Sequence, residues 1–98
     1  MSNIRIIELA VIPNSTSRVF TRILSVLERC NLGIEAVSTM KVSDDILYVV
    51  IAVRGPQEQA DLAVRHLKKS TNVIKAKLLT NETSLSQNNR VAYVSHAT

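Results

Sequence analysis

Few residues in this sequence of 98 residues could do chemistry, and their spacing does not favour catalysis. Cys30, the only cysteine, falls on the apolar side of a predicted helix, which favours a small core residue over a nucleophile. His66 and His96 have no second metal ligand three or four residues away. Asp44 and Asp45 are adjacent, so their carboxylates point apart, and a hairpin turn explains them better than an acid–base pair. We therefore expect no active site, no metal and no cofactor.

One stretch has the residue types of a small-ligand site. Asn14, Ser15, Thr16 and Ser17 follow a proline and have the chemistry of a turn and a helix N-cap. A helix start exposes backbone N–H groups that can bind an anion. Gly33, at the start of the next predicted strand, is a second place where a ligand can approach the backbone closely. We expect any small ligand to bind at these positions.

The residues between these two places have helical periodicity. Apolar side chains recur at i, i+4, i+7, i+8 and i+11, as in a helix that lies on a core: Val19, Ile23, Val26, Leu27 and Cys30. Arg18, Arg22 and Arg29 fall on the opposite, solvent-facing side. Asn31 is expected to end the helix, because its short polar side chain tolerates a positive φ.

The composition predicts one domain with an aliphatic core, since 46% of the residues are apolar and 3% are aromatic. No run of about 18 apolar residues and no basic-then-apolar leader occurs, so we expect a cytoplasmic protein without membrane contact. The net charge of +4 is spread along the chain. Scattered charge of this kind indicates a solvated surface, and no nucleic-acid partner is expected.

The order of the predicted elements is βαββαβ. Strands are expected at residues 4–11, 34–42, 46–54 and 73–79, and the second helix at 57–70. Right-handed crossovers then give an α+β ferredoxin-like sandwich, an antiparallel four-stranded sheet of order 4-1-3-2 with two helices on one face. Residues 1–80 form the domain, and residues 81–98 form a polar tail with a possible short edge strand at 90–95. The face without helices carries a predicted partner surface: Ile6, Ala10, Tyr48 and Val50.

Two other functions of this fold fit the sequence less well. RNA-recognition domains stack bases on aromatic residues of the first and third strands, and here those strands carry only Tyr48. Acylphosphatases bind phosphate with a glycine-rich loop and an arginine after the first strand. Arg18 is in the right place, but the glycines are absent, so this enzyme class remains a distant third possibility.

The start of the second strand, Asn31-Leu32-Gly33-Ile34-Glu35-Ala36-Val37, together with the element order, resembles an ACT domain. Among ACT proteins the chain is most similar to the small regulatory subunit of acetolactate synthase (acetohydroxyacid synthase). The end of the second helix, Leu67-Lys68-Lys69-Ser70-Thr71-Asn72-Val73, and the polar tail from Thr83 to Gln87 also resemble that family. The likeness covers roughly Ile4 to Asn81, and its motifs are diffuse.

The resemblance implies a non-catalytic subunit that forms a homodimer and activates the large, thiamine-diphosphate-dependent catalytic subunit. It places a branched-chain amino-acid effector at eight residues: Asn14, Ser15, Thr16, Ser17, Arg18, Leu32, Gly33 and Ile34. Arg18 and Gly33 depart from the family, where a glycine and an asparagine are usual, so sensitivity to valine is expected to be weak. The alternative is a stand-alone amino-acid-sensing ACT module that regulates another enzyme.

Overall fold

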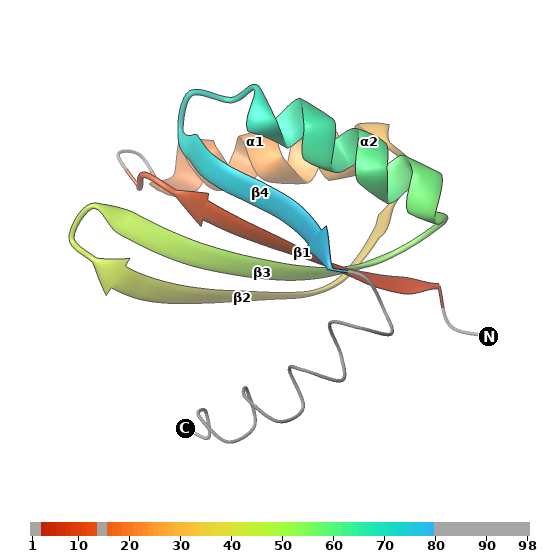
Figure 1. Cartoon of the computed structure of the whole chain (residues 1–98), viewed down its shortest axis with the longest axis horizontal. Coiled ribbons are helices and arrows are strands. Elements are labelled where there is room, and N and C mark those ends of the chain that lie inside the picture. Colours follow the sequence, from red (N-terminus) through yellow and green to blue (C-terminus); the bar gives the residue numbers. More distant parts are fainter. Residues whose placement is uncertain (1–2, 14–15, 80–98) are drawn as a thin grey trace, which may run out of the picture.

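The computed structural model describes residues 3–13 and 16–79, and its elements follow the predicted βαββαβ order (Figure 1). The elements are β1 (Ile4–Val11), α1 (Thr16–Arg29), β2 (Gly33–Ser43), β3 (Ile46–Arg54), α2 (Gln57–Lys68) and β4 (Val73–Leu79). The predicted tail at 81–98 and its possible strand at 90–95 lie outside the described residues. Within the described ranges, no helix is long and apolar enough to span a membrane.

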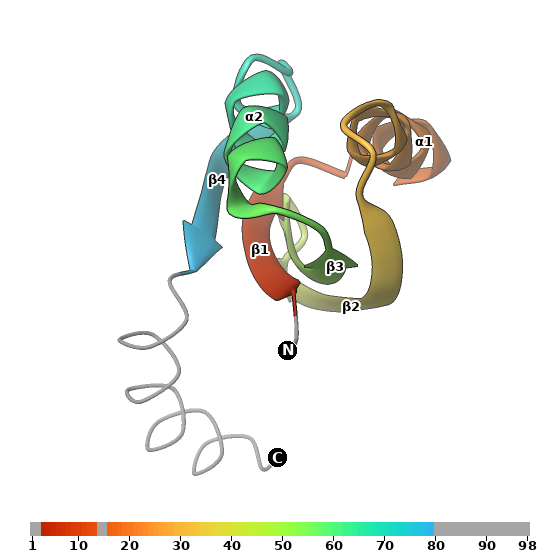
Figure 2. The ribbon, with the colours of Figure 1, turned by 90° about the vertical axis from the view of Figure 1, so that its right-hand side faces the viewer.

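The sheet is antiparallel throughout and has the predicted strand order, β2-β3-β1-β4. β1 and β3, which alternate in burial, occupy the centre, and β2 and β4 form the two edges. Figure 2 shows both helices on one face of the sheet, with α1 and α2 side by side above it. The fold is therefore the predicted ferredoxin-like α+β sandwich.

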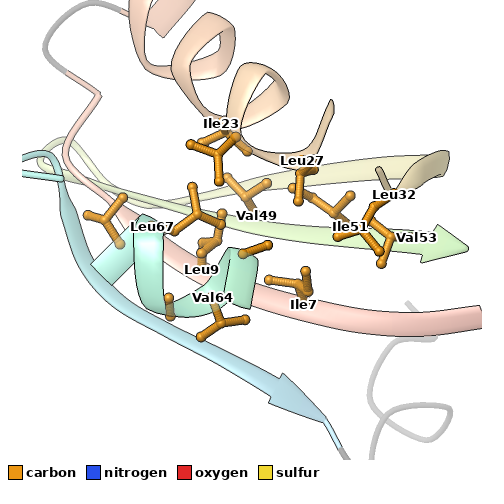
Figure 3. Close-up of a cluster of buried hydrophobic side chains, with 14 of the residues drawn as sticks. Ile7, Leu9, Ile23, Leu27, Leu32, Val49, Ile51, Val53, Val64 and Leu67 are labelled. Carbon is orange, nitrogen blue, oxygen red and sulfur yellow. The ribbon is translucent and has the colours of Figure 1, made fainter. Parts of the chain in front are cut away.

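Aliphatic side chains fill the space between the helices and the sheet (Figure 3). Alternate residues of β1 and β3 point toward the helices, which is the two-residue period of a strand with one buried face. The largest fully buried side chains come from both layers: Ile7, Leu9, Val11, Ile23, Leu27, Val49, Ile51, Val53 and Leu67. Each contributes about 1.5–3 kcal/mol by burial. This core fixes α1 relative to the sheet.

Strict alternation along residues 34–42 predicts one face with Ala36, Met40 and Val42 and the other with Glu35, Thr39 and Lys41, and β2 does not follow it throughout. Its register with β3 shifts between Ile34 and Ala36, and again between Lys41 and Ser43. Each bulge inserts a residue that has no partner in the ladder and bends the strand locally. Alternation alone places Glu35 and Lys41 on one face, but the first bulge takes Glu35 out of the ladder. The prediction of one uninterrupted alternating strand is therefore wrong at these two points.

Candidate functional site

Residues 14–18 are the first part of the predicted effector site and are here called the loop half-site. Asn14 and Ser15 lie outside the described residues, whereas Thr16 and Ser17 are the first two residues of α1. Arg18 follows in the first turn and its side chain is exposed. The first turn of a helix leaves backbone N–H groups without intrahelical acceptors. The loop half-site therefore has donors of the kind that a carboxylate requires.

The far end of α1 is closed by a Schellman motif. Asn31 has a φ of 60°, the left-handed conformation predicted for it. Its N–H donates to the carbonyl of Glu28 at 2.9 Å, and the Leu32 N–H donates to the carbonyl of Leu27 at 3.0 Å. The Leu32 side chain is 4% exposed and lies in the core (Figure 3). Leu32 can therefore offer a ligand its backbone but not its side chain.

Leu32, Gly33 and Ile34 are the second part of the predicted site, here called the strand half-site. Gly33 is exposed, and a Cβ added to it would meet the Cβ of Arg54 at 3.8 Å, an ordinary contact. The position therefore has room for a larger residue. Ile34 is 39% exposed and pairs with Val53. An effector at this half-site would contact the backbone of Gly33 and one aliphatic side chain.

A single chain does not bring the two half-sites together. Val11, where β1 ends, pairs with Leu47, whereas Gly33 pairs with Arg54 at the opposite end of β3. α1 connects these two ends of the sheet, and its 14 residues span about 21 Å. One protomer therefore holds two half-sites at opposite ends of α1 rather than one pocket.

A charged pair lies beside the strand half-site, and sequence reasoning did not single it out. The Arg54 Nε donates to the Glu35 Oε2 at 2.8 Å. The pKa of Glu35 lies below its usual value. The main cause is this hydrogen bond, and the charge of the guanidinium is the second. Both side chains are exposed, so the pair adds little to stability. It does place a carboxylate and a guanidinium, which could meet the two charges of an amino acid, next to Gly33.

The sheet face opposite the helices carries a small polar network. The Tyr48 hydroxyl donates to the Glu8 carboxylate, and the Lys77 Nζ lies 4.0 Å from the Glu8 Oε1. Burial, followed by the hydrogen bond to Glu8, raises the pKa of Tyr48. The apolar residues predicted on this face pair across β1 and β3 and are half-buried: Ile6, Ala10, Tyr48 and Val50.

The residues considered for catalysis take structural positions. Cys30 is 8% exposed and belongs to the core, as its place in the apolar stripe predicts. The Asp45 N–H donates to the Ser43 Oγ at 3.2 Å in the β2–β3 turn, so Asp44 and Asp45 form the predicted hairpin. In residues 3–13 and 16–79, no group of three or more His, Cys, Asp or Glu side chains could hold a metal ion. His96 lies outside these ranges.

No family model matches the sequence, and no curated protein matches it. Solved structures match it in fold. The ACT domain of GTP pyrophosphokinase from Chlorobium tepidum is 12% identical with a TM-score of 0.65, and the match covers 81% of this chain and 100% of that domain. The acetolactate synthase small subunit from Thermotoga maritima is 13% identical with a TM-score of 0.69. That match covers 83% of this chain but 50% of the small subunit, so this chain spans half of its length.

A protein of another functional class shares the fold as closely. The 30S ribosomal protein S6 from Thermotoga maritima is 17% identical with a TM-score of 0.68, and the match covers 94% of this chain and 98% of that one. At these identities the likeness shows the fold alone, which is ferredoxin-like and ACT-like. A function inferred from this fold is therefore a proposal by analogy.

Proposed function

We propose that this chain is a non-catalytic regulatory subunit that binds and activates the large catalytic subunit of acetolactate synthase in branched-chain amino-acid biosynthesis. The observation that carries the proposal is the ACT-like fold, shared with the small subunit of that enzyme from Thermotoga maritima. The resemblance of residues 31–37 to that family, at the start of β2, supports it. Catalysis belongs to the large subunit in this proposal, and the chain itself has a binding role.

We expect the protein to act as a homodimer that forms through the free edge of β2. All 11 residues of β2 are exposed, and they include Val37, Met40 and Val42 at 43%, 63% and 60% exposure. A long edge strand with exposed apolar side chains is a template for pairing with another strand. A second copy of the chain, paired antiparallel about a two-fold axis, would cover this edge in both protomers.

This dimer would also bring the two half-sites close together. In antiparallel pairing, the start of β2 in one protomer lies beside the end of β2 in the other. The end of β2 is at the same end of the sheet as the loop half-site, because Val11 pairs with Leu47 next to the β2–β3 hairpin. The strand half-site of one protomer would then lie toward the loop half-site of its partner, and the effector site would need both chains.

We expect this site to bind valine weakly. A guanidinium at Arg18 takes up space at the helix start that a glycine would leave to the carboxylate of the effector. Gly33 offers no side chain to orient a ligand, although its position has room for one. An amino acid needs several convergent polar groups in a protected pocket. With Arg18 and Gly33 at these positions, part of that requirement is not met.

The test is the rate of acetolactate formation by the cognate large subunit with and without this chain. We expect the rate to rise as the chain is added, and the chain alone to form no acetolactate. The control is the ACT domain from Chlorobium tepidum, which shares the fold at 12% identity and should leave the rate unchanged. A large subunit whose rate, stability and cofactor affinity do not respond to the chain would refute the proposal.

A second candidate function is a stand-alone ACT module that senses an amino acid for another enzyme. It is favoured by the match to the whole ACT domain from Chlorobium tepidum, whereas the match to the acetolactate synthase small subunit covers half of that chain. Affinity purification from the source cell separates the two. A thiamine-diphosphate enzyme as the main partner supports the first function, and a different enzyme as the main partner supports the second.

A further inference from the structure

α1 carries a basic hollow of which the effector hypothesis uses only Arg18. Arg18, Thr21, Arg22, Ser25 and Arg29 line an open hollow of about 540 Å³, here called the arginine groove. The spacing of these residues places them along one flank of the helix. From Arg18 to Arg29 the groove extends about 16 Å along the helix axis.

Two charges of the groove, those of Arg18 and Arg22, are unfavourable for the helix that carries them, whereas Arg29 lies in the last turn, where a positive charge is favourable. Arg18 lies in the first turn, which has no acidic residue, so its charge opposes the helix dipole. Arg18 and Arg22 are four residues apart, a spacing at which like charges repel. Among the described residues, none of Arg18, Arg22 and Arg29 forms an ion pair. By contrast, α2 has an acidic residue, Glu58, in its first turn.

The groove continues into a partly apolar cleft between the two helices. Val26, Arg29, Cys30, Leu62 and His66 line this second hollow of about 140 Å³, so Arg29 belongs to both hollows. α1 and α2 lie side by side here (Figure 2). Leu62 is 39% exposed, although it lies at the junction of the helices. The two hollows together offer a basic stripe that ends at an aliphatic surface.

We propose that an acidic polypeptide segment of the regulated enzyme docks in the arginine groove and inserts an aliphatic side chain between Val26 and Leu62. Carboxylates would satisfy the guanidinium groups with charge-assisted hydrogen bonds. Nucleic acid is the weaker fit, because no Phe, Tyr or Trp lines either hollow in the described part of the chain, and bases could stack only on His66 and the arginine side chains. The inference rests on the proposed function in taking the large catalytic subunit of acetolactate synthase as the partner.

The first experiment compares variants for binding to the cognate large subunit. Arg22→Gln with Arg29→Gln removes two charges from the groove and leaves Arg18, which also belongs to the effector hypothesis. The matched control, Arg65→Gln with Lys68→Gln, removes two exposed charges from α2 outside the hollows. We expect the double change in the groove to weaken binding at least about tenfold, and the control double change to weaken it less than about twofold. Binding of the unmodified chain should also depend more steeply on salt concentration than binding of the groove variant. If the unmodified chain binds and the groove pair binds equally well, the groove inference is wrong while the proposed function stands.

The second experiment tests the groove even if the large subunit does not bind. The probe is a synthetic helical peptide of about twelve residues, the length that spans the groove, with glutamates along one side and a terminal leucine. Titration into the ¹⁵N-labelled chain should shift the amide resonances of α1 and of Leu62, and Arg22→Gln with Arg29→Gln should abolish those shifts. No saturable shift, shifts that lie mainly on other basic residues, or tighter binding of a single-stranded oligonucleotide at α1 would overturn the inference.

Discussion

The two glycines of the chain should respond to substitution in opposite ways, because one is constrained and the other is not. Gly55 has a φ of +156°, which L-residues rarely adopt, and a Cβ added to it would lie 2.6 Å from the Leu32 Cδ2. Its N–H donates to the Asn3 carbonyl at 3.0 Å, and its carbonyl accepts from the Arg5 Nε at 3.1 Å. Gly55 therefore cannot move away without breaking these bonds, and Leu32 would have to shift within the core.

We expect Gly55→Ala to destabilise the protein by about 2–6 kcal/mol. Holding an alanine in a sparsely populated backbone conformation costs about 1–3 kcal/mol. Displacing the buried Leu32 side chain adds about 1–3 kcal/mol, the usual cost of overpacking a core. For a domain of this size, a loss of about 2 kcal/mol lowers the Tm by at least about 8 °C. Urea and thermal unfolding followed by circular dichroism measure both quantities.

Gly33→Ala is the matched control. Its added Cβ would meet the Arg54 Cβ at an ordinary 3.8 Å, and the backbone of Gly33 is not in the left-handed region. Reduced freedom of the unfolded chain should then stabilise this variant by about 0.4–1 kcal/mol. Equal losses of stability in the two variants, or a Gly55→Ala protein as stable as the unmodified one, would refute the steric reasoning.

Three further predictions test the effector site, the open sheet face and the assembly. Arg18→Gly with Gly33→Asn should strengthen valine binding measured by calorimetry. If the unmodified chain already binds valine at micromolar concentration and the double change weakens this binding, the assignment of the loop is wrong. Because the pKa of Tyr48 is raised, the folded state keeps its proton when the unfolded state loses it, so stability should fall as the pH rises above about 10. In Tyr48→Phe, the free energy of unfolding measured in urea should fall less across that pH range. Sedimentation at micromolar concentration should show a dimer, and a single 10.8 kDa species that stays soluble alone would count against pairing through β2.

The regular parts of the fold were predictable because their signals are periodic. The two-residue period of β1 and the helical period of α1 each identify one buried face, and the structure buries that face. The end of α1 was also predictable, since Asn31 is a residue type that adopts the left-handed conformation without strain. The element order, together with the rule that crossovers are right-handed, leaves few possible topologies. These considerations predicted the observed strand order.

The irregular parts were not predictable, because they depend on pairing between distant strands. An uninterrupted register counted back from the β2–β3 turn pairs Glu35 with Arg54, but two bulges make Gly33 the partner of Arg54 instead. The ion pair between Glu35 and Arg54 survives only because both side chains are long enough to reach across the bulge. Residue types do not encode such shifts in one sequence. The charged pair itself could have been found, because the uninterrupted register already places Glu35 opposite Arg54.

In the proposed dimer, the separation of the two half-sites would link sensing to assembly. In each protomer the described residues of the two half-sites lie at opposite ends of α1, a helix about 21 Å long. A ligand that contacts both kinds of half-site must therefore bridge two chains, and it binds the dimer in preference to the monomer. Ligand binding and dimerisation are then thermodynamically linked. The free energy by which the ligand stabilises the dimer equals the free energy by which dimerisation strengthens ligand binding. An effector that binds without tightening the dimer would thus occupy one half-site alone, and the Arg18 and Gly33 changes would then act independently rather than together.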